Sequence, residues 1–470
     1  MIHLRHFILS LSAFFSLMSF STSASTYLFQ QNGIRYRMYD DGFAVIVAGF
    51  ENFIPEECVI PDNVTFAGTV YPVISIDPDA LHSCALITSL TIGNNIQAIG
   101  NKAFSGCRNL RSVTISNSVI EIGNSAFSGC YKLESVSFGA AIKKIGNNAF
   151  SQDSSLVAIY IPNSVEHIGS KAFYDCKKLE TISLSSSLNE IKDSCFYNCQ
   201  SLKTITVPNA VTSIGEYAFY NCTTMTSATL SKSLKTIGNA AFSCSAFMPP
   251  CSALLSIEIP DSVETIGDYA FSECISLESL HLGNSVKHIG KQAFYHCKSL
   301  TSLNVPDSVA SIGMSAFMSC HNLKTAILGS SAIGNHAFQY CSSLESVQLS
   351  NSVENIGANA FNGCSKLKSI VLSNAIKSIK SYTFYNCESL ESIVIPNSVE
   401  DIGEKAFANC KALKNVSFES SLYAIGDYAF SYCSSLESLT IPAKNIGLSA
   451  FEYCNNVTSL ELTDVLCRYS

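Results

Sequence analysis

Apolar residues recur along this chain with a period of 23 residues, from near residue 58 to the end. A representative unit begins at Leu156 and reads Leu-x-x-Ile-x-Ile-Pro-Asn-Ser-Val-x-x-Ile-Gly-x-x-Ala-Phe-x-x-Cys. The Phe of this unit recurs every 23 residues, with 21 at two steps and 29 at one. A fixed period of this length indicates a repeat architecture, in which each unit buries its apolar face against its neighbours.

Each unit divides into a strand and a turn. Ile159 and Ile161 are two residues apart, so on a strand both point into the coil, while Ala158 and Tyr160 point outward. Pro162 ends the strand because it lacks an N–H donor and fixes φ. The spacing of three in Ala-Phe-x-x-Cys-x-x-Leu predicts a short helical turn with Phe, Cys and Leu on one side. The expected fold is an α/β repeat solenoid with a parallel sheet, one main strand and a short helical turn per 23-residue coil.

A glycine precedes the turn in most units, as Gly169 does here. Its recurrence suggests a left-handed or tightly packed backbone. Lys192 and Lys380 occupy the same position in two coils, so other residues are tolerated there. These glycines are structural, because no dinucleotide-binding glycine motif follows a strand.

The full unit resembles a known family. The pattern Ile-Pro-Asn-Ser-Val-Glu-x-Ile-Gly-x-x-Ala-Phe-x-x-Cys-x-x-Leu at residues 161–179 recurs at 395–413 and is similar to the repeats of BspA-like leucine-rich-repeat surface proteins. The segment from Gly33 to Ile76 resembles the N-terminal lead-in of bacterial members. The resemblance implies a leucine-rich-repeat solenoid, exposure on the cell surface, adhesion to host matrix proteins or other cells, and no enzyme activity. It does not supply a ligand.

The first 24 residues differ from the repeats. A short basic start at Arg5 is followed by an apolar run over residues 7–18 and by small residues up to Ala24. This is the pattern of a secretory signal, and the alternative of a retained membrane anchor is disfavoured because the run is short for a span. We expect a signal peptide in residues 1–24, an N-terminal β-hairpin cap in 25–76 and a solenoid in 77–470. The expected location is secreted or cell-surface.

The net charge argues against two classes of binding partner. The formal net charge is −8, and charged residues make up only 14% of the chain. A nucleic-acid or anionic-membrane partner would favour a basic stripe, so neither is expected.

Twenty cysteines in an exported chain would ordinarily indicate disulfides. Sixteen of them, however, occupy one column of the repeat, which Asp153 interrupts into runs of three and thirteen. Because both runs are odd, pairing of neighbours cannot use every cysteine, and a Cys here also serves as a small apolar filler. We favour buried thiols over stacked disulfides, with Cys244 and Cys251 as the pair that a short loop could join. A straight column of thiols cannot supply four tetrahedral zinc ligands, so no metal and no cofactor are expected.

One insertion breaks the period between Phe242 and Cys251. Pro249 and Pro250 mark a loop, in which Phe247 and Met248 would be partly exposed. The insertion is either neutral on a tolerant edge or a binding protrusion.

The outward strand positions form the concave face of the solenoid, and short hydroxyl side chains dominate it. The pattern has two interpretations. Ser and Thr are small enough for a crowded flat sheet, or they form a hydrogen-bonding surface for a ligand. An extended concave surface is the usual contact area of a solenoid, so this face is the leading site hypothesis. The candidate binding residues are Tyr160, Glu258, Ser279, His281, Ser302 and Asn304.

One place ahead of these positions, charges alternate in sign from coil to coil. The row reads Lys324, Glu345, Lys368, Glu391, Lys414, Glu437. Each charge would lie beside an opposite charge on the next strand, which favours a role in strand register.

Three functional classes follow from these patterns. A protein-binding adhesin is favoured over a surface glycan-binding protein, which would present aromatic platforms where only Tyr160 is found. A secreted hydrolase is third, because histidines and carboxylates fall at different phases of the repeat and do not converge. The sequence predicts a secreted or surface binding protein with a protein partner, a glycan as the alternative, and no enzyme activity.

Overall fold

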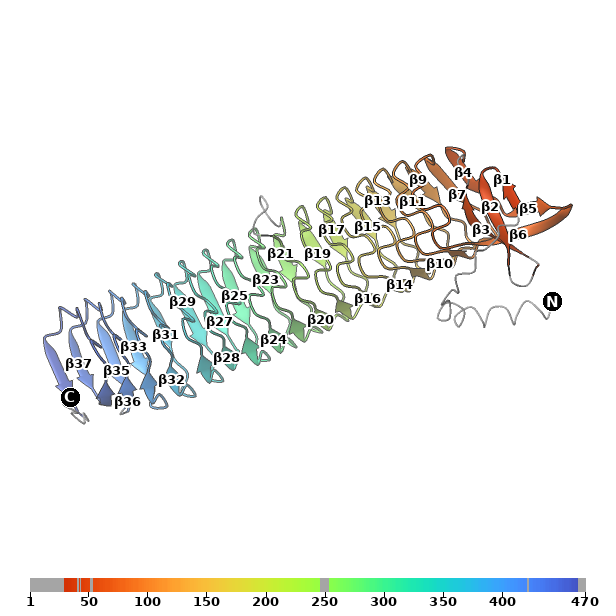
Figure 1. Cartoon of the computed structure of the whole chain (residues 1–470). Coiled ribbons are helices and arrows are strands. Elements are labelled where there is room, and N and C mark those ends of the chain that lie inside the picture. The colour runs from red at the N-terminus through yellow and green to blue at the C-terminus, as the bar shows by residue number, and fades with distance from the viewer. Residues whose placement is uncertain are drawn as a thin grey trace.

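The computed structural model describes residues 29–39, 42, 44–50, 54–245, 253–420 and 422–463. The chain forms one long rod, with the N-terminal strands at one end and the last coils at the other (Figure 1). The rod is a solenoid of about 16 turns of 23-residue coils. The residues predicted to form a signal peptide lie outside the described part of the chain.

Each coil contributes a main strand on one wall and a two- to four-residue strand on another. The N-terminal strands are β1 (Phe29–Gln31), β2 (Ile34–Met38), β3 (Val45–Phe50), β4 (Glu57–Ile60), β5 (Asn63–Phe66) and β6 (Thr69–Ile76). The main strands are β7 (Ser89–Ile92), β9 (Ser112–Thr114), β11 (Ser135–Ser137), β13 (Ala158–Tyr160), β15 (Thr181–Ser183), β17 (Thr204–Thr206), β19 (Ser227–Thr229), β21 (Ser256–Glu258), β23 (Ser279–His281), β25 (Ser302–Val305), β27 (Thr325–Leu328), β29 (Ser346–Leu349), β31 (Ser369–Val371), β33 (Ser392–Ile395), β35 (Asn415–Phe418), β37 (Ser438–Ile441) and β39 (Ser459–Leu462). The short strands are β8 (Ala98–Ile99), β10 (Glu121–Ile122), β12 (Lys144–Ile145), β14 (His167–Ile168), β16 (Glu190–Ile191), β18 (Ser213–Ile214), β20 (Thr236–Ile237), β22 (Thr265–Ile266), β24 (His288–Ile289), β26 (Ser311–Ile312), β28 (Ala332–Ile333), β30 (Asn355–Ile356), β32 (Ser378–Ile379), β34 (Asp401–Ile402), β36 (Leu422–Ile425) and β38 (Ala443–Ile446).

Neighbouring main strands stack in parallel, one repeat apart. On β9 and β11, Ser112 lies beside Ser135 and Val113 beside Val136. Val113, Ile205 and Ile393 each lie inside a main strand and are buried. The predicted strand phase is therefore confirmed, and each repeat position becomes a column that runs along the rod.

The segment after each glycine is not the short helical turn that the spacing predicted. The described residues contain no helix. In the coil after Gly100, Lys102 and Gly106 both have positive φ, 56° and 74°, which breaks a right-handed helix twice within one turn. Alternate backbone N–H groups also donate to the next coil and not within their own turn. The N–H groups of Lys102 and Phe104 donate to carbonyl oxygens one repeat away, at 2.8 and 2.7 Å. The prediction was wrong because tight turns that bond to the next coil produce the same side-chain spacing as a helix.

Gly100 is required by close packing and not by a left-handed backbone. Its φ lies outside the left-handed region, but a Cβ built on it would stand 2.5 Å from the backbone of Asp77 and Pro78 in the preceding coil. The tightly packed alternative of the sequence prediction is the one that the structure shows.

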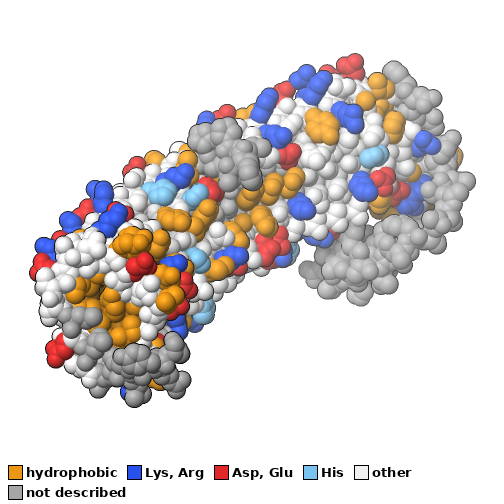
Figure 2. Space-filling model, turned by 60° about the vertical axis from the view of Figure 1, so that its left-hand side comes forward, with side chains coloured by type: hydrophobic (Ala, Val, Ile, Leu, Met, Phe, Trp, Pro, Cys, Tyr) orange, Lys and Arg blue, Asp and Glu red, His pale blue; other side chains and the backbone are white. Residues whose placement is uncertain are grey.

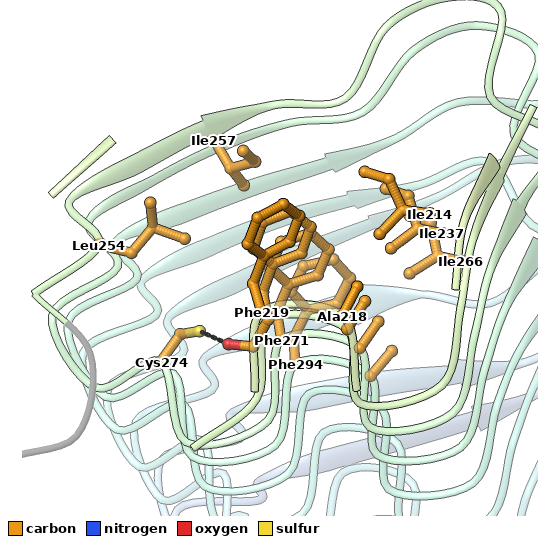
Figure 3. Packing of buried hydrophobic residues seen from close by; sticks show 14 of the residues in the cluster. Ile214, Ala218, Phe219, Ile237, Leu254, Ile257, Ile266, Phe271, Cys274 and Phe294 are labelled. Atoms are coloured by element: carbon orange, nitrogen blue, oxygen red, sulfur yellow. Dashed lines mark hydrogen bonds between the residues drawn. The ribbon is translucent and has the colours of Figure 1, made fainter. Parts of the chain in front are cut away.

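The core is a set of stacked columns. A stack of phenylalanine rings runs from Phe104 to Phe451, with neighbouring ring centroids 5.0 to 5.6 Å apart. Figure 3 shows Phe219, Phe271 and Phe294 in the middle of the coil, beside a ladder of isoleucines that includes Ile214. Such burial of apolar rings drives the stacking of repeats that could not fold alone.

The cysteine column lines the same core as free thiols. Each described column cysteine is buried, except Cys454, which is half-buried. The Cys130 thiol donates to the Phe104 carbonyl oxygen of the preceding coil at 3.3 Å, and the same oxygen accepts from the Cys107 N–H. A cysteine therefore fills a small apolar space and also satisfies a buried carbonyl. Cys251 lies outside the described residues, so its pairing with Cys244 stays a prediction.

The N-terminal end carries an antiparallel lead-in. Strands β1, β2 and β3 pair antiparallel in order, and β5 and β6 form a hairpin whose turn contains Ala67 and Gly68, both at positive φ. Strand β6 then pairs in parallel with β8, and β4 pairs with β7. The Arg37 guanidinium holds the Asp77 carboxylate with two contacts of 2.7 and 2.9 Å, which joins the lead-in to the first coil.

Candidate functional site

The outward side chains of the main strands form one continuous surface, called here the sheet face. The first residue of each strand contributes a hydroxyl row, in which Ser or Thr occupies nearly every coil. The third residue contributes a mixed row, which changes character along the rod. Because the inner residues of the same strands pack into the core and the outer ones do not, residues on the sheet face can vary without disturbing the stack.

Two adjoining hollows lie on the sheet face. The first hollow has a volume of about 570 Å³ and extends over β25, β27 and β29, with Leu280 of β23 at its edge. The second hollow has a volume of about 390 Å³ and lies over β21 and β23. Both are shallow depressions where small outward side chains leave the strand backbone accessible.

The structure brings five of the six predicted binding residues together. Glu258, Ser279 and His281 line the second hollow, and Ser302 and Asn304 line the first. All five are exposed and lie on three neighbouring main strands, β21, β23 and β25. They form one contiguous patch.

Tyr160 lies apart from that patch. It is 63% exposed on β13, and three main strands separate it from β21. At about 4.8 Å per strand, the separation is about 19 Å. Phe247 and Met248, the predicted loop site, lie outside the described residues.

The first hollow also contains four outward residues that are not among the six candidate binding residues. Thr325, Ile327, Ser346 and Gln348 complete its rim. Their phase in the repeat was the available signal, since they occupy the same positions as Ser302 and Asn304. What the phase could not show was that the surface is hollowed over these strands.

Glu258 and His281 give the second hollow its charge. The two residues are direct neighbours across β21 and β23, at the third position of each strand. A carboxylate beside an imidazole offers a ligand both a hydrogen-bond acceptor and a donor within one strand spacing.

Charged residues line one edge of the sheet face, one place ahead of the hydroxyl row. This charged row contains the ion pairs Arg111–Glu134 at 2.7 Å and Glu345–Lys368 at 3.6 Å. The backbone amide of Lys368 donates to the Glu345 carbonyl, so the row follows the stacking of the coils. The pairs are half-exposed, so each contributes about 0.2–1 kcal/mol, as expected for a register device.

Apolar side chains interrupt the mixed row toward the C-terminus. Ile327 is 48% exposed, Val371 81% and Val394 51%. An exposed aliphatic residue is ordinary by itself, but three on one row of one face mark a region suited to a protein contact.

Tyrosines stack on the turn side of the rod, away from the sheet face. Tyr174, Tyr197 and Tyr220 stack with centroid distances of 4.7 and 4.9 Å. Their faces cover one another, so the stack leaves ring edges and not open platforms for a sugar. The sequence prediction missed this ladder, although Tyr follows the core Phe in three successive coils.

Asp153 is the one carboxyl group in the cysteine column. It is fully buried, and its Oδ1 accepts the Cys130 N–H at 2.8 Å. Its Oδ2 has no hydrogen-bond partner within the described ranges. Burial raises the pKa of Asp153 well above its usual value, so the group belongs to the core and not to a solvent-facing site.

Charges of both signs are spread over the rod in the view of Figure 2, without a face of one sign. Within the part of the chain that the structure describes, no three His, Cys, Asp or Glu side chains come together in a metal-binding arrangement. The same part holds no helix with the length and hydropathy of a membrane span.

Stacked 23-residue coils, a parallel sheet and buried Leu, Ile and Phe columns together define a leucine-rich-repeat solenoid. A model of the BspA type leucine rich repeat region matches residues 74–201, 143–248, 244–332 and 331–458. The chain therefore belongs to the BspA-type leucine-rich-repeat family, as the sequence resemblance predicted.

Several solved structures are similar. A leucine-rich repeat protein from Bacteroides ovatus is 31% identical over 89% of this chain and 100% of its own, with a TM-score of 0.66. A leucine rich cell surface protein from Faecalibacterium prausnitzii is 22% identical over 94% and 96%, with a TM-score of 0.41. The pneumococcal vaccine antigen PcpA is 21% identical over 81% and 94%, also with a TM-score of 0.41. No curated protein matches the chain.

Proposed function

We propose that this protein is a secreted or cell-surface binding protein that holds a protein partner on its sheet face, in adhesion to matrix proteins or to other cells. The observation that carries the proposal is the pair of adjoining hollows, lined by Glu258, Ser279, His281, Ser302 and Asn304. Membership of the BspA-type family supports a surface location. The proposal includes export through the predicted signal in residues 1–24.

A protein partner fits this surface better than a sugar. The patch is broad and shallow, with hydroxyl groups, one carboxylate, one imidazole and the exposed Ile327 beside it. Protein interfaces of ordinary size cover about 800 Å² per partner and combine an apolar centre with polar surroundings. Tyr160, the aromatic residue that a glycan site would use, lies outside the hollows.

The test pairs two double variants. Ser279→Arg with Ser302→Arg fills both hollows with long side chains and should weaken binding to a matrix protein, selected from a purified panel, by at least about tenfold. Thr204→Arg with Ser227→Arg places the same change on β17 and β19, outside the hollows, and should leave binding unchanged. Circular dichroism would verify that both variants fold.

The outcomes separate the alternatives. Equal loss of binding in both double variants would show that the partner uses the whole face and would refute a site at the hollows. Unchanged binding in both, with loss on Phe247→Ser and Met248→Ser, would move the site to the inserted loop. Ser243 should be kept, because its hydroxyl donates to the Ser272 carbonyl inside the stack.

A further inference from the structure

The charged row over β27–β37 has a regular alternation of sign that the alignment of neighbouring strands does not require. Its signs alternate through six coils, an even number, in the order Lys324, Glu345, Lys368, Glu391, Lys414, Glu437. Read backwards, the row has the opposite sign at each place. Two copies of this row laid side by side in opposite directions therefore match each Lys with a Glu.

The mixed row on the same strands has its apolar residues at the middle of this stretch. Val371 on β31 and Val394 on β33 are exposed, and β31 and β33 are the third and fourth of the six strands. A reversal about the point between these strands exchanges Val371 with Val394. The most exposed aliphatic side chain of the face, Val371, would then meet an aliphatic partner.

We propose that the sheet face over β27–β37 binds a second copy of this chain, face to face and with the rods antiparallel. The two-fold axis runs parallel to the strands, between β31 and β33. Lys368 then faces Glu391 of the second copy, and Val371 faces Val394 of the second copy. The inference uses the same face as the proposed function but does not depend on any foreign ligand.

The outer strands agree with this arrangement. Glu345 faces Lys414 of the second copy, and Lys324 faces Glu437. One coil further, Asn304 on β25 faces Glu461 on β39, an amide opposite a carboxylate. A two-fold interface of this kind is self-complementary by construction.

The antiparallel direction is the one that the charges select. If the rods ran in the same direction face to face, the charged edge of one copy would cover the mixed row of the other. Lys368 would then approach Val371 or its neighbours instead of a carboxylate. Burying a charge against an aliphatic side chain without a partner is unfavourable, so the parallel arrangement is disfavoured.

The size of the face indicates what class of interface the dimer would have. Six coils at about 4.8 Å and four-residue strands of about 13 Å give a flat area of roughly 400 Å² on each copy. Specific interfaces usually bury about 800 Å² of accessible surface per partner. The accessible surface of this face exceeds its flat area because side chains project from it, but the interface is still small. Small interfaces are typical of weak, transient association, so we expect dimerisation in the micromolar range. The dimer would cover the first hollow and leave the second free.

Sedimentation velocity on the purified chain, without ligand, at concentrations from about 1 to about 200 μM, tests the proposal. The wild-type protein should dimerise in this range. Lys368→Glu alone places two carboxylates together twice per dimer, and Glu391→Lys alone does the same with two amines. Each single variant should associate at least about tenfold more weakly.

The decisive sample is the mixture of the two single variants. In a mixed dimer, Glu at 368 of one copy faces Lys at 391 of the other, and the remaining Lys368 faces the remaining Glu391. Association of the mixture should therefore return to near the wild-type value, which no effect within one copy can produce. Lys203→Glu, which breaks the Lys203–Glu180 ion pair of the N-terminal coils, is the matched control and should leave dimerisation unchanged.

Two results would overturn the inference: a wild-type protein that stays monomeric throughout the range, or a mixture that associates no better than either single variant. Neither result bears on ligand binding at the second hollow. Ligand binding is measured separately with Ser279→Arg, which lies in the second hollow and outside the dimer interface, so the two proposals fail independently.

Discussion

The sheet face over β9–β19 and the sheet face over β21–β33 rest on the same core but differ in chemistry. Along the third strand positions, the N-terminal stretch reads Thr114, Ser137, Tyr160, Ser183, Thr206, Thr229. The C-terminal stretch reads Glu258, His281, Asn304, Ile327, Gln348, Val371, Val394. The first is a hydroxyl surface interrupted once by Tyr160. The second begins with Glu258 and His281, continues with Asn304, Ile327 and Gln348, and ends in two valines.

The difference shows where a repeat protein can vary. The inward positions of both stretches are aliphatic residues that pack into the core, because each coil must match its neighbours, although Val136, Ile182 and Ala228 of the first stretch are only partly buried. The outward positions have no such constraint, so their residue types can vary to suit a ligand or a second copy of the chain. Both hollows lie over the varied stretch, which supports assigning recognition to that part of the face.

The largest expected effect tests whether the two stretches share one core. Phe127→Ala and Phe361→Ala each remove one ring from the stack, where the ring centroids on either side lie 5.2–5.3 Å and 5.5–5.6 Å away. Each should cost about 3–5 kcal/mol locally, since both leave a cavity in a close-packed column. Hydrogen exchange would show the loss of protection in the coils on either side, because repeat arrays open locally. Loss confined to one of the two variants would mean that the cores differ, and the comparison would fail.

A smaller effect on stability is expected from Asp153, the residue that replaces a cysteine in the cysteine column of the N-terminal coils. Burial raises the pKa of its carboxyl group well above the usual value, so the folded state keeps a proton that the unfolded chain releases above about pH 3.9. The unfolded state then binds fewer protons than the folded state, and the stability of the wild-type protein falls as pH rises through this interval.

Asp153→Asn keeps the Oδ1 acceptor for the Cys130 N–H but cannot ionise. Its melting temperature should equal that of the wild-type protein near pH 4 and exceed it by a few degrees, about 2–4 °C, at pH 8. A constant difference between the two proteins across that range would contradict the neutral, buried acid.

The columns were predictable because a strict period fixes them. Once Ile159 and Ile161 face inward, every residue at the same phase does so too, and the strands, the Phe stack and the buried thiols follow. The conformation of the turn after each core glycine was not predictable by the same reasoning. Its left-handed positions are occupied by residues such as Lys102 and Tyr217, so no recurring glycine marked them.

The candidate site was predictable in position but not in depth. Phase alone placed Ser302 and Asn304 on the outer face beside Ser279 and His281. The hollows arise from the volumes of side chains on neighbouring strands, which a one-dimensional pattern does not give. The Asn and Asp residues after the core glycine also escaped prediction, although Asn101 Oδ1 accepts the Asn124 N–H of the next coil at 2.7 Å and the same contact recurs along the rod.

The smallest expected effect on stability exchanges the chemistry of the two stretches. Val371→Thr with Val394→Thr gives the C-terminal stretch the hydroxyl surface of the N-terminal one, and Thr206→Val with Thr229→Val does the reverse. All four side chains point to solvent, so neither double variant should change the free energy of unfolding by more than about 0.5 kcal/mol. Self-association should weaken in the first variant, which loses the apolar centre of the proposed dimer, and stay unchanged in the second. A stability loss above about 1 kcal/mol in the first variant would show that Val371 and Val394 serve the fold of their own copy, because exposed residues without a structural role do not cost that much. Their place in the mixed row would then be a packing feature, and the difference between the two stretches would no longer point to recognition.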